Sequence, residues 1–258
     1  MDVADPGAFD TEIPGQKAGS VVSYYMVATV GDMQVTSPSR APDNFYAFYV
    51  GPLDVVWFDD FEQDTGWTHG LDVGNGEEGQ DDWQKGEPQG ASTDPYSAYS
   101  GTHVWGNDLG SEGWNGLYQP EIKNYLLSPP IDCSACVGAR LQFRRWLHVE
   151  DGQYDQARIF INDDLIWNNE ETTSGEKHRL DSLWAFQDFD ISQYADGQTI
   201  QIRFEMETDQ GLQFGGWNLD DMAVVVPGSE STTPGGNNNG NSGSSGGLLG
   251  GCACSLVS

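Results

Sequence analysis

Two stretches of alternating residues decide the fold: "RLQFRRWLHV" at residues 140–149 and "TIQIRFEMET" at residues 199–208. A period of two between apolar and polar side chains predicts a β-strand with one buried face. In the second stretch Gln201, Arg203, Glu205 and Glu207 are expected to face outward, and in the first Arg145 interrupts the inner face. The expected inward-facing side chains are Leu141, Phe143, Leu147, Val149, Ile200, Ile202, Phe204 and Met206.

Further strands lie on either side of these two. "ARIFIND" at residues 157–163 and "DDMAVVV" at residues 220–226 have the same character, and the segments between strands are polar and rich in Gly, Asp and Asn. No segment has a convincing helical period. Residues 52–227 are therefore predicted to form an all-β domain, an antiparallel two-sheet jelly-roll sandwich.

The two ends of the chain differ from this main body. "GSVVSYYMVATVGD" at residues 19–32 and "NFYAFYVG" at residues 44–51 predict strands. Two or three strands make no independent domain, so residues 1–51 are expected to be a partial β-sandwich segment or a linker hairpin. Residues 228–258 are rich in Gly, Ser and Asn and predict a disordered tether.

The charge of the chain excludes some partners. Its 258 residues include 40 acidic and 11 basic ones, for a net charge of -29. Such a chain repels nucleic acid and anionic membrane surfaces. Most of these acids serve solubility or a saline habitat, and only a few are needed for metal binding. The sequence contains no apolar run of 18 residues, so it predicts no transmembrane segment.

Five motifs occur in a fixed order along the chain: "DDFEQDTGWT" (59–68), "SGTHVWGNDLG" (100–110), "YLLSPPID" (125–132), "RLQFRRWLHVEDGQYDQARIFIND" (140–163) and "GGWNLDDMAVV" (215–225). Together they resemble the MAM-like jelly-roll modules of bacterial secreted peptidases, including those of the immune inhibitor A type. The resemblance implies a non-catalytic accessory module from the C-terminal end of a secreted bacterial hydrolase, such as a zinc metallopeptidase of carboxypeptidase type. Such a module would be a monomer that contacts a protein or polysaccharide substrate or a cell surface.

Two shorter resemblances concern the ends. The strands before residue 52 resemble the closing strands of the fibronectin-like domains that follow catalytic domains in bacterial secreted peptidases. The beginning "MDVADPGAFDTEIPGQ" has no secretory signal pattern, so we expect a longer secreted protein upstream. "GGCACS" at residues 250–255 resembles the start of the MYXO-CTERM sorting signal, which implies processing or lipid attachment at Cys252 and anchoring to the outer cell surface. The hydrophobic helix and basic cluster of that signal are missing here.

Paired acids suggest a structural metal ion. If the first and last strands lie side by side, Asp59, Asp60 and Glu62 approach Asp220 and Asp221, and gathered carboxylates need compensation. Calcium provides it, because it takes six to eight oxygen ligands in flexible geometry. The family resemblance implies a calcium ion at Glu62 with Asp221 or Asp220, and Asp108 is a weaker candidate. The alternative is that Asp220 ends a turn and Asp221 faces solvent.

Catalysis is not expected from this chain. Glu150 and Asp155 in "EDGQYD" could act as acid and base, but a glycine-bearing segment between strands predicts a solvated hairpin turn. The two acids are retained as candidates for a ligand surface. The four histidines form no HExxH pattern, and GxSxG is missing.

Aromatic loops suggest a second class of function. Trp105, Trp114 and Tyr118 lie in Gly- and Asp-rich segments where they could stack on sugar rings or hold apolar side chains. The alternative function is therefore a stand-alone cell-surface adhesin or carbohydrate-binding protein. Cys133 and Cys136 are expected to form a local disulfide, or else two free thiols.

Overall fold

A computed structural model describes residues 8–10, 12–37, 45–74, 76, 79–111, 113–228 and 255–257. Strands are the main regular elements of the described part, which contains a single four-residue helix, α1 (Ser192–Ala195). No described helix is long and apolar enough to cross a membrane. Cys252 and most of the predicted tether lie outside the described residues.

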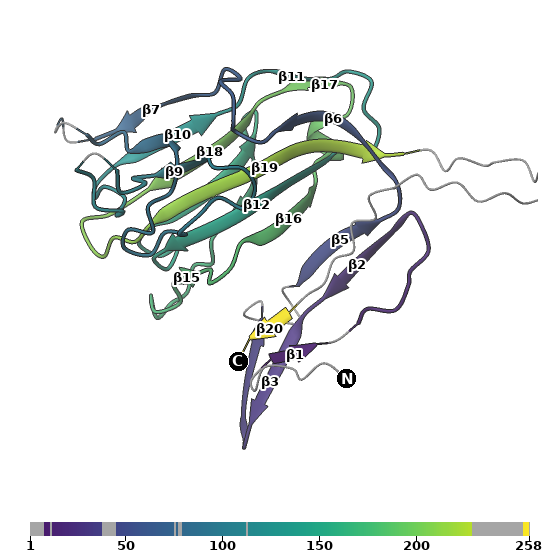
Figure 1. The fold of residues 1–258 in the computed structure, drawn as a ribbon, viewed down its shortest axis with the longest axis horizontal. Helices are drawn as coiled ribbons and strands as arrows, with labels where there is room; N and C mark the ends of the chain where they lie inside the picture. The colour runs from purple at the N-terminus through teal and green to yellow at the C-terminus, as the bar shows by residue number, and fades with distance from the viewer. Residues whose placement is uncertain are drawn as a thin grey trace, which may run out of the picture.

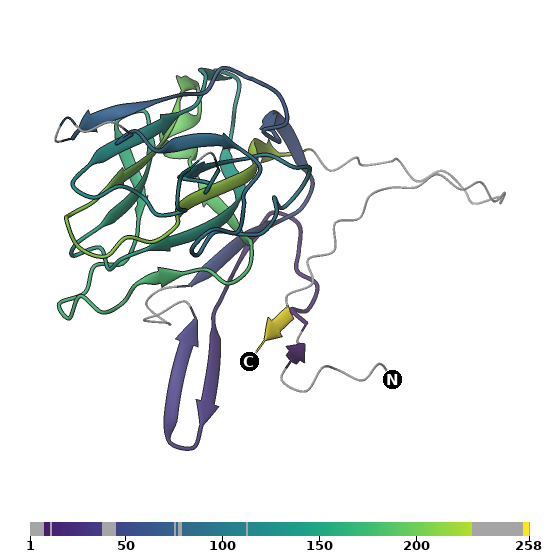
Figure 2. The same ribbon diagram turned by 60° about the vertical axis from the view of Figure 1, so that its left-hand side comes forward.

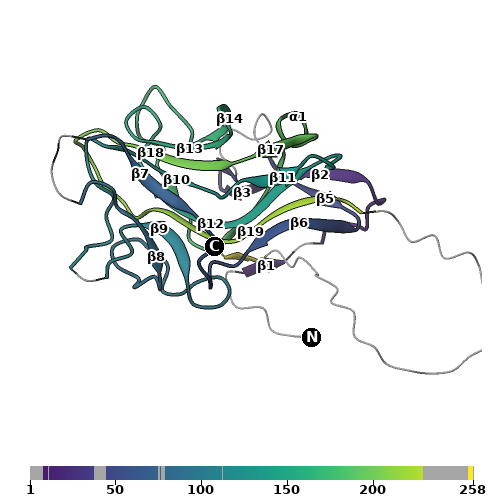
Figure 3. The ribbon, with the colours of Figure 1, turned by 90° about the horizontal axis from the view of Figure 1, so that it is seen from above.

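Two antiparallel sheets form the main body, one above the other (Figure 3). The five-stranded sheet has the order β14 (Asp164–Asn168), β13 (Gln156–Ile161), β18 (Ile202–Glu207), β10 (Lys123–Leu127), β7 (Thr68–Val73). The second sheet has the order β15 (Arg179–Leu180), β12 (Arg140–Val149), β19 (Gly216–Pro227), β9 (Val104–Asn107), β8 (Trp83–Gly86), with β16 (Ala185–Asp190) also paired to β12 and β6 (Leu53–Asp59) to β19. The predicted all-β antiparallel sandwich is confirmed.

The core lies between these sheets and follows the predicted alternation. Strand β12 buries every second residue, and its inner side chains face those of β18. Aromatic rings occupy the centre, where Phe204 lies edge-on to both Phe143 (5.4 Å between ring centroids) and Trp217 (5.3 Å). All eight predicted inward-facing side chains are buried.

Two charged residues of these strands depart from a simple inside-outside pattern. Arg145 does lie on the inner face of β12, where it is buried and its Nε donates to Asp181 Oδ2 at 2.9 Å. Glu205 lies on the predicted outer face, yet it is only 3% exposed. The reason is that Lys123, Arg158 and Arg203 all contact its carboxylate and cover it.

The N-terminal strands form narrow ribbons beside the sandwich (Figures 1 and 2). Strand β2 (Ser20–Tyr24) pairs with β5 (Tyr46–Val50), and β3 (Met26–Val30) with β4 (Met33–Ser37). The Tyr49 backbone N–H in β5 donates to Asp188 Oδ2 at 2.9 Å, which ties the first ribbon to β16. The remaining pairs are β1 (Ala8–Asp10) with β20 (Ser255–Val257) and β11 (Ile131–Cys133) with β17 (Gln198–Ile200).

The domain boundaries at residues 51 and 227 remain predictions. Strand β5 is separated from β6 only by Gly51 and Pro52, and the last strand of the sandwich, β19, ends at Pro227.

Candidate functional sites

Three of the connections that cross from one sheet to the other at one end of the sandwich carry candidate residues. They join β9 to β10 (108–122), β12 to β13 (150–155) and β18 to β19 (208–215). The registers place these ends together, because Glu207 pairs with both Lys123 and Gln156. Residues far apart in the sequence therefore meet where the three crossovers lie.

The segment "EDGQYD" is one of these crossovers, and its prediction as a solvated hairpin turn is wrong. Strands β12 and β13 belong to different sheets, so the segment is covered by its neighbours. Glu150 is 7%, Asp151 0% and Asp155 1% exposed. Burial raises the pKa of Asp151, but hydrogen bonds from Thr172, Gln153 and Lys177 outweigh burial and lower that pKa to about 2.

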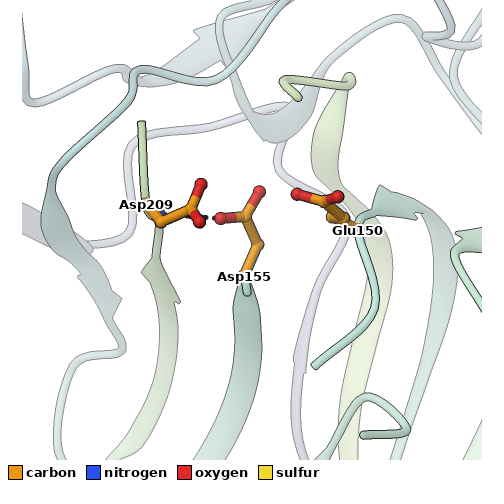
Figure 4. Close-up of side chains that lie close together, drawn as sticks. All are labelled: Glu150, Asp155 and Asp209. Atoms are coloured by element: carbon orange, nitrogen blue, oxygen red, sulfur yellow. Dashed lines mark hydrogen bonds between the residues drawn. The ribbon is translucent and has the colours of Figure 1, made fainter. Parts of the chain in front are cut away.

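Glu150 and Asp155 form an acidic cluster with Asp209 from the third crossover (Figure 4). One carboxylate oxygen from each residue lies within 4.8 Å of the other two, and the three carboxyl groups point toward one another. Asp155 is held in place because its Oδ2 accepts the Tyr118 hydroxyl at 2.6 Å and its Oδ1 accepts the Asp209 backbone N–H at 2.8 Å. We call these three residues the crossover cluster.

Burial and mutual repulsion raise pKa values in the crossover cluster. The pKa of Asp155 rises to about 6, chiefly through burial; the hydrogen bonds from Tyr118 and Asp209 oppose this rise, and the charges of Glu150 and Asp209 add smaller contributions to it. Burial, and then the charges of Asp209 and Asp151, raise the pKa of Glu150. Carboxylate oxygens suit a hard divalent cation. Among the residues that the structure describes, Glu150, Asp155 and Asp209 form a group that could hold one.

The predicted metal ligands at the first and last strands meet through a loop. Glu62, just after β6, binds residues 102 and 103: its Oε1 accepts the N–H groups of Thr102 (2.7 Å) and His103 (2.8 Å). Its Oε2 lies within hydrogen-bond distance of the Thr102 hydroxyl and of His103 Nδ1. The backbone hydrogen bonds lower the pKa of Glu62 to about 2.

The paired aspartates of β19 bind the preceding residues of the same loop. Asp220 Oδ2 accepts the N–H groups of Tyr99 (2.8 Å) and Ser100 (3.0 Å), and its Oδ1 accepts the N–H of Asp221. Asp221 Oδ1 accepts the Ser100 hydroxyl at 2.6 Å. Asp220 is fully buried, and burial raises its pKa to about 6. We call Glu62, Asp220, Asp221 and loop 99–103 the loop clasp.

The loop clasp fits a calcium ion poorly as it stands. Hydrogen-bond donors already occupy the carboxylate oxygens of Glu62 and Asp220, and an ion would have to replace them. Asp221 alone retains an oxygen with no hydrogen bond to the described residues. The doubled aspartate of the sequence thus has a structural role of its own.

The other two predicted ligands lie apart. Asp60 Oδ1 accepts the N–H of Glu62 at 3.2 Å. Asp108 accepts the N–H groups of Gly110, Asn115 and Gly116, so it organises the loop that follows β9. Neither is brought into a cluster of ligands in the described part of the chain.

The aromatic residues are divided between a groove and the core. Trp105 and Trp114 line a groove of about 510 Å³ together with Trp83, His69 and Lys85. The indole N–H groups of Trp83 and Trp105 have no partner among the described residues. Tyr118, predicted as part of a ligand platform, is instead only 1% exposed, because its hydroxyl is directed into the crossovers toward Asp155.

The two described cysteines are free and buried. The Cys136 N–H donates to the Cys133 carbonyl at 3.0 Å, which forms a tight turn after β11. Burial, and then the neighbouring Cys136, raise the pKa of the Cys133 thiol to about 12. The Cys133 thiol is therefore not a reactive thiolate near neutral pH.

Sequence reasoning missed Asp209 and the residues of loop 99–103. Asp209 follows the alternating strand β18 as Glu150 follows β12, so its position after a predicted strand was a usable signal. The loop residues bind mainly through backbone N–H groups, for which the sequence carries no signal.

Comparison with known proteins finds relatives among bacterial proteases. No family model matches the chain. The chain is 30% identical over 220 residues to Bacillopeptidase F of Bacillus subtilis (strain 168), which covers 84% of the chain and 14% of that protein. It is 33% identical over 119 residues to the Pre-pro-metalloprotease PrtV of Vibrio cholerae serotype O1, covering 43% of the chain and 13% of that protein. The chain thus spans about one seventh of the curated relatives it matches.

Solved structures of β-rich modules also align with the chain, at low similarity. The K1 cleaved adhesin domain of Lys-gingipain from Porphyromonas gingivalis W83 is 16% identical, with a TM-score of 0.43, covering 69% of this chain and all of that one. The CBM22-1 xylan-binding domain of Paenibacillus barcinonensis Xyn10C is 13% identical, with a TM-score of 0.31, covering 70% of this chain and 99% of that one.

Proposed function

We propose that this chain is a non-catalytic, calcium-stabilised accessory module from the C-terminal end of a secreted bacterial hydrolase, which contacts substrate or the cell surface. The observation that carries the proposal is the alignment of 84% of the chain with 14% of a bacterial protease. A segment of that size is typical of a single module in a larger protein. The carboxypeptidase type, the monomeric state and an anchor at Cys252 remain predictions.

The composition of the buried sites supports calcium stabilisation. The sandwich buries several carboxylates that have raised pKa values, and the crossover cluster places three acids around one point. A cation that binds such oxygens raises the stability of the folded state by mass action. The crossover cluster has the more accessible ligand oxygens, whereas the loop clasp offers only the free oxygen of Asp221.

Thermal unfolding tests this function. We expect millimolar calcium to raise the melting temperature of the wild-type chain and excess chelator to lower it. A change in neither condition would contradict calcium stabilisation. Hydrolysis of casein or of a xylan by the purified chain would contradict the non-catalytic role.

A second candidate is a carbohydrate-binding or adhesive surface, which the tryptophan groove favours. Its wall carries three indole rings and polar groups from His69, Gln84 and Lys85. Indole faces stack on sugar rings, and Trp114 is the partly exposed ring of the three, since Trp83 is 2% and Trp105 7% exposed. Retention on immobilised polysaccharides, lost in Trp114→Ala and kept in Asp163→Asn, would support this candidate.

A further inference from the structure

We infer that the crossover cluster of Glu150, Asp155 and Asp209 is a calcium site, separate from the loop clasp predicted by the sequence. The inference rests on the proposed calcium stabilisation and assigns the ion to a place. It predicts that the bound ion joins the second and third crossovers at one end of the sandwich.

Glu150 is the residue that points to a ligand. Its side chain is aimed into the cluster and the residue is 93% buried, yet its carboxylate makes no hydrogen bond or ion pair with any described residue. A carboxylate with little solvent and no donor is stabilised by a cation that reaches it. The Glu150 oxygens are not among the described side-chain atoms that are wholly shielded from solvent and lack a partner, so an ion can reach them. The Tyr118 hydroxyl and the Asp209 backbone N–H donate to the Asp155 carboxylate, and neither donates to the carboxylate of Glu150.

No basic side chain in the described part of the chain forms an ion pair with the crossover cluster. None of the described ion pairs involves Glu150, Asp155 or Asp209, and Lys123, Arg158 and Arg203 are all engaged with other acids. The chain carries 11 basic residues against 40 acidic ones, so few remain for any one cluster. A cation from solution is the remaining partner for three gathered carboxylates.

The access from solvent also suits an ion. Gly211 lies beside the cluster: its N–H donates to Asp209 Oδ1, and a β-carbon there would lie only 2.8 Å from that oxygen. Asp209 is exposed and lines an open cavity of about 360 Å³, so solvent reaches the cluster from the side of this residue. With only oxygen ligands from the side chains, calcium suits the site better than zinc, which prefers nitrogen and sulfur.

Calcium titration of chelator-treated protein by isothermal calorimetry at neutral pH tests the site. The test variant is Asp209→Asn, because Asp209 is exposed and its backbone N–H still donates to Asp155. Asp163→Asn, at another exposed acid, is the matched control, and Asp221→Ala probes the loop clasp. We expect Asp209→Asn to weaken calcium binding about tenfold or more, with Asp163→Asn and Asp221→Ala unchanged at this site.

Thermal unfolding provides an independent readout of the same site. In chelator, Asp209→Asn and Glu150→Gln should melt at or above the wild-type temperature, because each removes repulsion between the acids. In calcium the order should reverse, because only the wild type has the full ligand set. A protonated acid pair without a metal would give the same order in both conditions and would overturn the inference.

The outcomes separate the site from the proposed function. If calcium stabilises the wild type and Asp209→Asn equally, but not Asp221→Ala, the ion sits at the loop clasp: the inference fails and calcium stabilisation stands. If the wild type binds no calcium, both fail.

Discussion

The loop clasp and the crossover cluster gather similar acids and treat them in opposite ways. In the loop clasp, Glu62 accepts the backbone N–H groups of residues 102 and 103. Asp220 accepts those of residues 99, 100 and 221. In the crossover cluster, no described group donates a hydrogen bond to the Glu150 carboxylate. The Asp155 carboxylate accepts only two, from the Tyr118 hydroxyl and the Asp209 backbone N–H. The number of donors, and not the number of acids, decides which group can accept a cation.

The electrostatic consequences differ accordingly. Backbone donors lower the pKa of Glu62 to about 2, so it remains charged at any physiological pH. Burial raises the pKa of Asp155 to about 6 because two hydrogen bonds do not offset it. Asp220 shows that donors alone are insufficient, since three backbone N–H groups leave its pKa near 6 when the residue is fully buried.

Replacement of Asp220 should give the largest effect. Asp220→Ala leaves the N–H groups of Tyr99, Ser100 and Asp221 without their acceptor in a buried site. We expect a loss of about 3 kcal/mol in the free energy of unfolding, measured by urea denaturation. Asp163→Ala, at an exposed acid, should change it by less than about 0.5 kcal/mol. Equal stability of both variants would show that the loop clasp does not hold the fold.

A glycine in the loop clasp gives the next effect. Gly101 has φ of +57°, and a β-carbon there would collide with Glu62 Oε1. Gly101→Ala should cost about 2 kcal/mol by urea denaturation, from backbone strain and displacement of Glu62. Gly197→Ala is the control, because Gly197 has φ of +77° but open space around its α-carbon. If the two variants lose the same stability, contact with Glu62 contributes nothing.

The acid limb of the stability profile tests Glu62 itself. The pKa of Glu62 lies below its unfolded value of 4.5, so its contribution is present above about pH 4.5 and is lost as pH falls toward about 2. Glu62→Gln should flatten that part of the profile, measured by urea denaturation from pH 2 to pH 6, with a smaller loss at neutral pH than Asp220→Ala. An unchanged acid limb would exclude Glu62 as its source.

The smallest predicted effect concerns Asp155, whose folded pKa lies above its unfolded value. Without calcium, its contribution to stability is therefore present at low pH and is lost as pH rises from about 4 to about 6. Asp209→Asn removes one repelling charge and should lower the pKa of Asp155 by a fraction of a pH unit, measured by carbon-13 NMR titration of the carboxyl group. Asp163→Asn should leave the pKa of Asp155 unchanged. A pKa of Asp155 that stays near 6 in Asp209→Asn would show that the Asp209 charge does not contribute to the shift.

Much of the fold could be predicted from the sequence, because alternation depends only on which residues need burial. Strands β12 and β18 bury the predicted faces. Glu205 escaped prediction because its cover comes from Lys123 and Arg158, which neighbouring strands supply. The site was harder: Glu150 and Asp155 were identified as candidates, but their exposure was wrongly predicted and Asp209 was missed.

The sequence by itself determined the strands, their buried faces, the polar segments between them and the large acidic excess, since these follow from residue type and order. Only the tertiary structure decided that residues 150–155 cross between sheets instead of turning back within one. It also decided that loop 99–103 directs its N–H groups at Glu62 and Asp220 and leaves Glu150 without a donor. The physical reason is that the cost of a carboxylate depends on burial and nearby donors, and packing between distant segments fixes both.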